Sequence, residues 1–287
     1  MGLRKTARTQ EQIVFATRTL RHVFADKLGD GEVNLYELAR SRRIYRLELC
    51  PLLSDGRLLL DNSGFRVQLN NPEKLVVSLD SGDPPTLTRK QRFTLAHEIA
   101  HTLVYDIARN PPKEVEQILT VIAEAGGSAP ADSVEQFCQI SAGLILMPSG
   151  SLRKAIGGRR LDSPEEVVRL ADTFKVSAEA LIHRVAQTST GESLRTDNHA
   201  LLMVAPLEKK EEIRAVLYSP TMRCALTPPK LYGGIRYWLK RNSLPSGILG
   251  ETTGNWTVRK QTGTLDIKRR PYGRRSGAWF LNIDLIQ

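Results

Sequence analysis

Two proline pairs enclose the segment that most constrains how this chain can fold. Pro84-Pro85 and Pro111-Pro112 stand on either side of RKQRFTLAHEIAHTLVYDIARN. Proline disrupts a helix interior, so a helix here begins after the first pair and ends before the second. Thr88 and Gln91 have the spacing of a capping box, which marks the start. We expect a helix over about residues 89–107, with an apolar face made of Phe93, Ala96, Ala100, Leu103 and Val104.

The segments around this helix predict an α+β protein. Helices at 10–28 and 33–43 precede residues 45–80, where short β-type runs and Gly- or Pro-containing breaks predict a small antiparallel meander. Further helices are expected at 113–125 and at 131–150, the latter ending at Pro148. In residues 163–187, Ser163 has the position of an N-cap and a four-residue turn separates two helices, which predicts a helix-turn-helix.

Composition places the chain among proteins with a packed core. Its 287 residues are 41% hydrophobic, and no stretch approaches the roughly 20 apolar residues that span a bilayer. Residues 1–12 carry charge but lack the apolar region of a secretion signal. We therefore expect a cytoplasmic protein with no membrane partner. Cys50, Cys138 and Cys224 are too far apart for a Cys-rich zinc site, so any metal must rest on histidine and carboxylate.

The positive charge of the chain is concentrated in its C-terminal third. Residues 199–287 contain 15 Lys/Arg and 6 Asp/Glu, a net charge of +9 out of a total of +10. Clustered basic residues release counterions when they neutralise phosphates, which favours a polyanion as partner; a solvated surface is the alternative. Because the turn-rich stretch 188–198 predicts a linker, we expect domains at 1–150, 151–190 and 199–287, the last an α/β domain with a helix at 208–218.

Two histidines of the long helix can bind one metal ion. His97 and His101 are four residues apart, so they lie on one helix face and both imidazoles can reach a single tetrahedral zinc ion. Glu98 lies on the neighbouring flank, where it can take a proton from an attacking water and return it to a leaving amine. This is the arrangement of HExxH hydrolases. The alternative is two histidines that merely cover an amphipathic helix.

A third metal ligand has to come from elsewhere in the chain. Glu135 opens an apolar helix that can pack against the first one and project a carboxylate toward the imidazoles. It also has the spacing of a capping box with Asp132 as N-cap, which needs no metal. The other candidates are Asp106, Glu114, Glu116, Glu124, His183 and His199.

Three segments, in this order, resemble the ImmA/IrrE family of metallopeptidases. They are RKQRFTLAHEIAH (89–101), EQFCQISAGLILMP (135–148) and LADTFKVSAEAL (170–181), and the resemblance extends over about residues 30–187. It implies a zincin-like domain with His97, His101 and Glu135 as metal ligands and Glu98 as general base. Zinc suits these ligands, and manganese also accepts histidine and carboxylate. Many relatives have Asn or Asp where this chain has Gln139, which leaves the support of Glu135 open.

The resemblance also implies a substrate and a trigger. Members of this family cut a partner protein, commonly a helix-turn-helix transcriptional repressor, under stress or DNA damage. A basic C-terminal domain behind the peptidase is similar to the arrangement in two branches of the family. In IrrE that domain is GAF-like, and in the CapP peptidases of anti-phage CBASS pairs single-stranded DNA stimulates cleavage. We therefore expect a repressor as substrate and single-stranded DNA as activator.

Basic residues of the C-terminal domain are candidates for nucleic-acid binding. They alternate with aromatic residues, and charge beside rings is what sequence-tolerant binding of single strands requires. The alternative is that the rings form a core and the charges are solvated. The basic candidates are Lys240, Arg241, Arg259, Lys260, Lys268, Arg269, Arg270, Arg274 and Arg275.

Four other features each have two interpretations. Tyr105 could donate to an oxyanion or orient a ligand, but we favour packing. Cys138 could face the metal as a thiolate, but we favour a small buried hydrophobe. The strand LVVSL (75–79) could be the edge to which an extended substrate adds, or an ordinary internal strand. The second helix of 163–187 offers the DNA groove only His183, Arg184 and Gln187, so we favour a structural role.

The sequence therefore predicts a metal-dependent endopeptidase of α+β class. A zincin-like domain with a helix-turn-helix-like segment is expected to precede a second α/β, GAF-like sensor domain. The competing hypothesis is a DNA-binding transcriptional regulator that keeps the metal site as structure or relic. A structural zinc site usually has four protein ligands, whereas the sequence offers three and an acid placed for water, which favours the enzyme.

Overall fold

The structure is a computed structural model that describes most of the chain between Val33 and Gln187 and the strands beyond. The described residues are 14, 16–20, 23–24, 33–79, 84–109, 130–157, 161, 163–187, 199–207, 210–218, 251–258, 261–271 and 279–286. Side chains are described up to residue 186, except those of 105–109 and 130–133. The chain divides into two compact units, Met1–Leu152 with Phe174–Val176, and Arg153–Thr173 with Ser177–Gln287.

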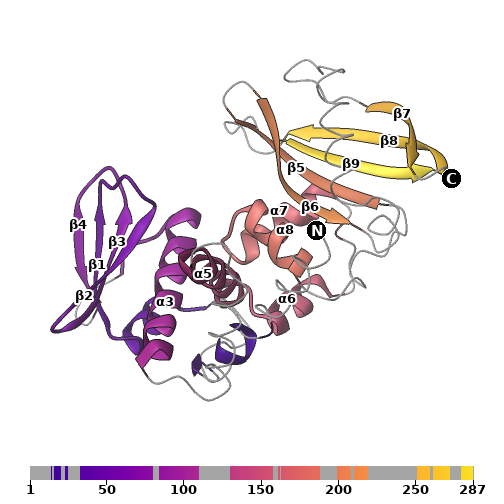
Figure 1. Ribbon diagram of the computed structural model, residues 1–287. Helices are drawn as coiled ribbons and strands as arrows, with labels where there is room; N and C mark the ends of the chain where they lie inside the picture. Colours follow the sequence, from indigo (N-terminus) through magenta and orange to yellow (C-terminus); the bar gives the residue numbers. More distant parts are fainter. Residues whose placement is uncertain are drawn as a thin grey trace. The chain divides into compact units, whose positions relative to one another are not determined.

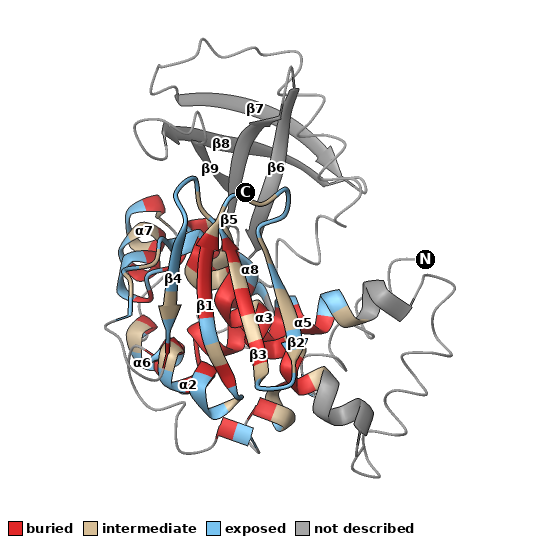
Figure 2. Ribbon diagram, turned by 90° about the vertical axis from the view of Figure 1, so that its left-hand side faces the viewer, coloured by how far each residue is buried: buried red, intermediate tan, exposed pale blue. Residues whose placement is uncertain are grey.

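The first unit contains a mixed four-stranded sheet. Its strands are β1 (Ile44–Cys50), β2 (Gly56–Asp61), β3 (Gly64–Asn70) and β4 (Leu75–Ser78), in the order β2-β3-β1-β4. β1 runs parallel to β3, whereas β2 with β3 and β1 with β4 are antiparallel. Figure 2 shows the largely buried strands β1 and β3 between β4 and β2. Both β2 and β4 therefore lie at edges of the described sheet.

The antiparallel meander predicted for residues 45–80 is wrong in its topology. The β2–β3 hairpin places β3, not β2, beside β1. Leu47, Val67 and Leu69 of the two central strands are fully buried, while Leu60 of β2 and Leu75 of β4 are exposed. Alternating hydrophobicity locates strands and turns, but the choice of neighbours depends on which strands bury the most apolar surface.

A glycine allows the tight connection between β2 and β3. Gly64 has a φ of 134°, a conformation that residues with a Cβ rarely adopt. A Cβ atom here would lie 2.6 Å from the carbonyl oxygen of Arg43. That same oxygen accepts a hydrogen bond of 2.9 Å from the Phe65 backbone N–H, which holds the start of β3 beside β1.

Helices cover one face of this sheet. α2 (Leu35–Ser41) begins at Asn34, whose side chain accepts hydrogen bonds from the next turn. α3 (Arg89–Arg109) packs on β2 and β3, and α5 (Pro130–Leu146) packs on α3, as Figure 1 shows. The described residues between 14 and 24 are helical as well. The predicted helix at 113–125 lies outside the described residues.

The long helix α3 starts where its capping box predicts. The backbone N–H of Gln91 donates to Thr88 Oγ1 over 3.2 Å, and the Thr88 N–H donates to Gln91 Oε1 over 3.0 Å. Further along, the Arg42 guanidinium donates from Nε to Thr102 Oγ1 (3.0 Å) and from Nη2 to the Thr102 carbonyl (3.2 Å). The helix is thus fixed at its start and beside His101.

The predicted apolar face of α3 is only partly correct. Ala96, Ala100 and Leu103 are buried as expected, together with Leu95 and Ile99. Phe93 and Val104 are instead half-buried. These two residues share a helix face with His97 and His101, and all four line the same pocket. The core face of the helix is therefore rotated relative to the prediction.

The helices that follow agree with the sequence, except that the short helix after Pro148 was not predicted. α5 ends at Leu146, just before Pro148, and α6 spans Ser149–Ile156. In the second unit, α7 (Pro164–Thr173) is capped by Ser163, whose Oγ accepts from the Glu166 N–H at 3.2 Å. The turn 174–177 leads into α8 (Ala178–Gln187), capped by Ser177. The predicted helix-turn-helix is thus present as two helices and a short turn.

The C-terminal region contains an antiparallel five-stranded sheet. Its strands are β5 (His199–Leu207), β6 (Lys210–Tyr218), β7 (Glu251–Val258), β8 (Gln261–Pro271) and β9 (Trp279–Ile286), in the order β6-β5-β9-β8-β7. The helix predicted at 208–218 is wrong, because this segment forms β6 and pairs with β5. Glu and Lys favour a helix locally, but pairing with a neighbouring strand overrides that preference. Among the described helices, none combines the length and the apolar character that crossing a bilayer requires.

Candidate metal centre

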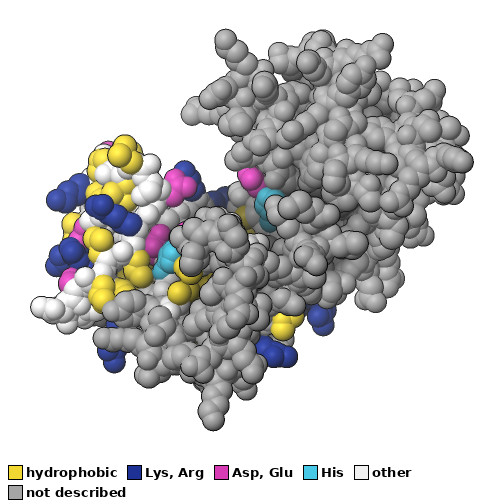
Figure 3. All heavy atoms as spheres, viewed as in Figure 1, with side chains coloured by type: hydrophobic (Ala, Val, Ile, Leu, Met, Phe, Trp, Pro, Cys, Tyr) yellow, Lys and Arg dark blue, Asp and Glu magenta, His cyan; other side chains and the backbone are white. Residues whose placement is uncertain are grey.

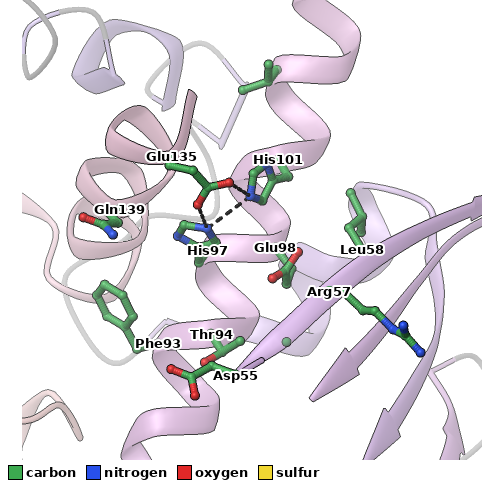
Figure 4. Close-up of a pocket in the computed structure, with 12 residues that line it drawn as sticks. Asp55, Arg57, Leu58, Phe93, Thr94, His97, Glu98, His101, Glu135 and Gln139 are labelled. Carbon is green, nitrogen blue, oxygen red and sulfur yellow. Dashed lines mark hydrogen bonds and ion pairs between the residues drawn. The ribbon is translucent and has the colours of Figure 1, made fainter. Parts of the chain in front are cut away.

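Three side chains from two helices converge at one point. His97 and His101 extend from adjacent turns of α3, and Glu135 extends from the first half of α5 (Figure 4). The Nε2 atoms of the two histidines lie 3.1 Å apart. Glu135 Oε2 lies 3.2 Å from His97 Nε2, and its Oε1 lies 3.4 Å from His101 Nε2. The packing of α5 on α3 therefore joins residues that are far apart in the sequence.

The three groups fit a small divalent cation. Ligand atoms bound to a tetrahedral zinc ion at about 2.1 Å lie about 3.4 Å from one another, close to the distances of 3.1, 3.2 and 3.4 Å found here. If one imidazole nitrogen carries a proton, it can donate that proton to only one of the other two groups. A cation between the three groups would satisfy all of them. Histidine and carboxylate are the donors that zinc and manganese accept.

The surroundings keep the two histidines neutral. Burial is the largest influence on each imidazole and lowers the pKa of both His97 and His101. The neighbouring His101 lowers the pKa of His97 further, and the Glu135 carboxylate opposes these effects at both residues. A neutral imidazole is the form that binds a metal ion.

Glu98 lies beside the three groups, on the side of the helix that faces β2. In Figure 4 it lies on the side of the histidines nearer to Leu58, opposite to Glu135. The residue is only 5% exposed. Burial, and after it the negative charge of Glu135, raises the pKa of Glu98 to about 7. A carboxyl group with such a pKa can both accept and release a proton near neutral pH.

Glu135 is not the last member of a capping box. α5 begins at Pro130, so Asp132 lies within the helix and not at its N-cap. The Glu135 side chain is 55% exposed and uses both oxygens toward the histidines. Of the other proposed third ligands, His183 is exposed on α8. The remaining ones have no described side chain: Asp106, Glu114, Glu116, Glu124 and His199.

A pocket of about 720 Å³ surrounds this site. Its walls come from α3, from α5 and from the start of β2 with the loop before it. Figure 3 shows histidine and acidic side chains next to each other on one face, near hydrophobic ones. Beside the three converging side chains and Glu98, the lining residues are Asp55, Gly56, Arg57, Leu58, Phe93, Thr94, Val104 and Gln139.

Sequence reasoning missed the contribution of β2. Asp55-Gly56 has the pattern of a turn, and nothing local indicates that the strand after it would reach the histidines. LVVSL, which we considered as the substrate edge, forms β4 at the opposite end of the sheet from β2. Phe93 and Val104, in contrast, share the helical spacing of His97 and His101 and could have been recognised as pocket residues.

Other predicted site residues are placed as follows. Tyr105 belongs to α3, but its side chain lies outside the described residues, so its role stays a prediction. Cys138 is fully buried, and burial followed by the charges of Glu135 and Glu98 raises the pKa of its thiol, in agreement with a neutral packing residue. Gln139 is exposed and lines the pocket.

The basic candidates of the C-terminal domain are only partly located. Lys268, Arg269 and Arg270 belong to β8, between β9 and β7, but their side chains are not among the described ones. The others lie outside the described residues: Lys240, Arg241, Arg259, Lys260, Arg274 and Arg275. Their proposed contact with nucleic acid therefore stays a prediction.

Comparison with known structures and curated proteins adds little. A solved structure named "Mycobacterium tuberculosis transcriptional regulator" aligns over 95% of this chain and 74% of its own, with 13% sequence identity and a TM-score of 0.49. A similarity of this size assigns neither fold nor function. No curated protein matches the chain significantly.

Comparison with protein families is more informative. The profile of the IrrE N-terminal-like domain, a peptidase family, matches residues 86–186. The matched part begins just before α3 and ends within α8, so it includes His97, Glu98, His101 and Glu135. The four-stranded sheet precedes it. The mixed helices and small sheet of the first unit fit a metallopeptidase of this kind. Residues 86–186 thus match an IrrE N-terminal-like peptidase domain, which supports the resemblance to the ImmA/IrrE family.

Proposed function

We propose that this protein is a zinc-dependent endopeptidase of the HExxH type. His97, His101 and Glu135 hold the metal, and Glu98 is the general base. The observation that carries this proposal is the convergence of three metal-binding groups from α3 and α5 within 3.1–3.4 Å, with a buried carboxylate beside them in an open pocket. Manganese is the alternative metal, because it accepts the same donors.

The chemistry divides between the metal and the chain. A zinc ion at this site would acidify a water molecule and polarise the scissile carbonyl. Glu98 accepts the proton of the attacking water and passes it to the leaving amine. Three protein ligands would leave a zinc ion one position for water, as in catalytic sites and unlike closed structural sites. The Tyr105 hydroxyl is a further donor for the developing oxyanion in this proposal.

The substrate lies in extended form along β2. In the described sheet β2 pairs only with β3, so its other edge presents backbone groups to a peptide. Gly56 and Leu58 of β2 line the pocket opposite the histidines. A peptide added there would pass Glu98 with its scissile bond near the metal ligands. β2 is therefore the proposed substrate edge, in place of β4.

The proposed substrate is a helix-turn-helix transcriptional repressor, cleaved in response to DNA damage or single-stranded DNA. The family match supports a protein substrate, and the net charge of +9 in residues 199–287 supports a nucleic-acid trigger. Cleavage would relieve repression of a stress or anti-phage operon of the CBASS type. We retain the domains 1–150, 151–190 and 199–287, the last as a basic, GAF-like sensor.

The competing proposal, a DNA-binding regulator, finds little support in α8. Among its described side chains, those of residues 178–186, the exposed ones are His183 and Ala186, with Glu179 half-buried in the first turn. Arg184, one of the three residues that sequence reasoning offered to the DNA groove, is buried. A recognition helix needs side chains that reach base edges and phosphates. The acidic first turn of this helix would repel phosphates instead.

A cleavage assay tests the proposed function. The purified protein is mixed with zinc and a helix-turn-helix repressor, taken from a neighbouring gene if one is encoded there, with and without single-stranded DNA, and the products are separated on a gel. Discrete fragments that form faster with the DNA are expected. Glu98→Gln, which keeps the shape of the side chain but not the base, is the matched control.

The outcomes separate the parts of the proposal. Cleavage that is independent of single-stranded DNA would contradict the proposed sensor role of the C-terminal domain and would still support the peptidase role. An intact repressor under all conditions, with zinc bound, would contradict the assigned substrate. Specific binding to duplex DNA that survives loss of the metal ligands would favour the regulator.

A further inference from the structure

β2 approaches the catalytic helix unusually closely at Gly56. A Cβ atom on this residue would lie 2.4 Å from Thr94 Cγ2, 3.0 Å from the Gln68 carbonyl oxygen and 3.3 Å from Leu69 Cδ2. Carbon atoms in contact are ordinarily about 3.5–4.0 Å apart. The bare backbone of Gly56 therefore supplies the space that the Thr94 methyl group fills.

Thr94 cannot easily turn away from this contact. Its hydroxyl donates a hydrogen bond of 3.0 Å to the Lys90 carbonyl, one turn back in α3. That bond selects the rotamer, and the branched side chain has little other freedom in a helix. Thr94 is also only 7% exposed. It lies one turn before His97 and Glu98 on the same helix, so the contact is adjacent to the proposed catalytic residues.

Two further attachments hold the same end of the helix to the sheet. Lys90 Nζ lies 2.6 Å from Asp55 Oδ1, in the residue just before Gly56. Gln91 Nε2 donates to the Asn70 carbonyl over 3.1 Å and to Asn71 Oδ1 over 3.2 Å, at the end of β3. The separation of β2 from α3 is thus set at several points around Gly56. A displaced strand would strain all of them.

We propose that Gly56, through its contact with Thr94, is a positioning residue that sets the width of the substrate cleft between β2 and the catalytic helix. This inference rests on the proposed peptidase function and on the substrate position along β2. A larger residue at position 56 moves the strand by about 1 Å, the difference between 2.4 Å and an ordinary carbon–carbon contact. A peptide held on β2 then reaches Glu98 and the metal ligands in the wrong position.

The test is a pair of substitutions that creates and then removes the clash. Gly56→Ala adds the Cβ atom, and Thr94→Ser removes the methyl group that it meets while keeping the hydroxyl bond to Lys90. With a proteome-derived peptide library as probe and single-stranded DNA present, Gly56→Ala should lower kcat/KM by about 100-fold, as a misplacement of about 1 Å can. The double variant should recover most of this loss, with Thr94→Ser alone as the reference that shows the effect of the missing methyl group by itself.

Two other readouts separate positioning from general damage. Zinc affinity should be unchanged in Gly56→Ala, since His97, His101 and Glu135 belong to α3 and α5. Amide hydrogen exchange in peptides that cover Gly56–Asp61 should rise in Gly56→Ala and return to the wild-type rate in the double variant. This exchange measurement needs no substrate, so it tests the contact even if the protein cuts nothing.

The outcomes are distinct for the two proposals. A wild type that binds zinc and cuts no peptide contradicts the proposed function, while the exchange data still decide about the contact. A wild type that cuts, with Gly56→Ala equal to it in kcat/KM and exchange, overturns the inference. If Gly56→Ala does not fold, the double variant tests the inference in its place. Near-normal exchange and kcat/KM in the double variant would support the inference. Impairment or misfolding would mean that Thr94 does not set the spacing.

Discussion

The helices α3 and α8 begin alike and differ in what their exposed faces can do. Each starts at a hydroxyl cap, Thr88 or Ser177, and each buries an apolar face. Each also carries histidine on its open side. On α3, His97 and His101 meet Glu135 in a pocket. On α8, His183 is exposed and belongs to no cluster of metal-binding groups among the described side chains.

The difference shows what turns a histidine into part of a site. Two imidazoles four residues apart share one face, and a second helix must then supply a third donor at the same point. α5 does this for α3 by placing Glu135 between the histidines. The helix-turn-helix shape of α7 and α8 offers no equivalent, which is why we assign the activity to α3.

The largest expected effect separates the two kinds of histidine. His101→Ala removes a proposed ligand, whereas His183→Ala removes an exposed side chain. Loss of a group that only supports a ligand lowers metal affinity by about 10–100-fold, so loss of the ligand should exceed this. Zinc affinity measured by competition with a chelator should fall more than about 100-fold for His101→Ala and stay unchanged for His183→Ala. Equal affinities in the two variants would break the comparison.

A second pair of substitutions tests how firmly each helix is packed. Ile99 of α3 and Ile182 of α8 are both fully buried. Truncation of either to alanine removes buried methyl groups and should cost about 2–5 kcal/mol of unfolding free energy. Thermal or denaturant unfolding of each variant checks this. A cost below about 1 kcal/mol for Ile99→Ala would mean that α3 is not held by the sheet as described.

The smallest expected effect concerns the helix starts. Thr88→Ala removes a hydroxyl that accepts from the Gln91 N–H and donates to Gln91 Oε1, whereas Ser177→Ala removes one acceptor for the Ala180 N–H. Loss of a cap costs about 1 kcal/mol. We expect a slightly larger loss for Thr88→Ala, measured by chemical unfolding. The opposite order would indicate that the Gln91 side chain contributes little to the cap.

Local features of the chain were predictable because local forces decide them. The caps at Thr88 and Ser163 and the stop at Pro148 need only neighbouring residues, and the structure confirms the helices that they delimit. The spacing of His97 and His101 follows from helix geometry alone. The family resemblance, which the match to residues 86–186 confirms, added the expectation for Glu135.

Features that depend on distant parts of the chain were not predictable. The parallel pairing of β1 with β3 reflects burial of both central strands, which no single strand reveals. Gly56 and Leu58 reach the pocket because β2 lies beside α3, and β6 is a strand because β5 pairs with it. In each case tertiary packing outweighs what the local sequence favours.

The most direct test of the central claim compares the wild type with Glu98→Gln at equal zinc content. Both proteins are loaded with zinc, the metal is quantified, and new peptide termini in a proteome-derived library, incubated with single-stranded DNA, are identified by mass spectrometry. We expect discrete cleavage by the wild type and a loss of at least about 100-fold in the variant, since general acid–base catalysis contributes about 10²–10⁴-fold. Equal cleavage by the two proteins, or none by a zinc-loaded wild type, would contradict the assignment of α3 as a catalytic helix.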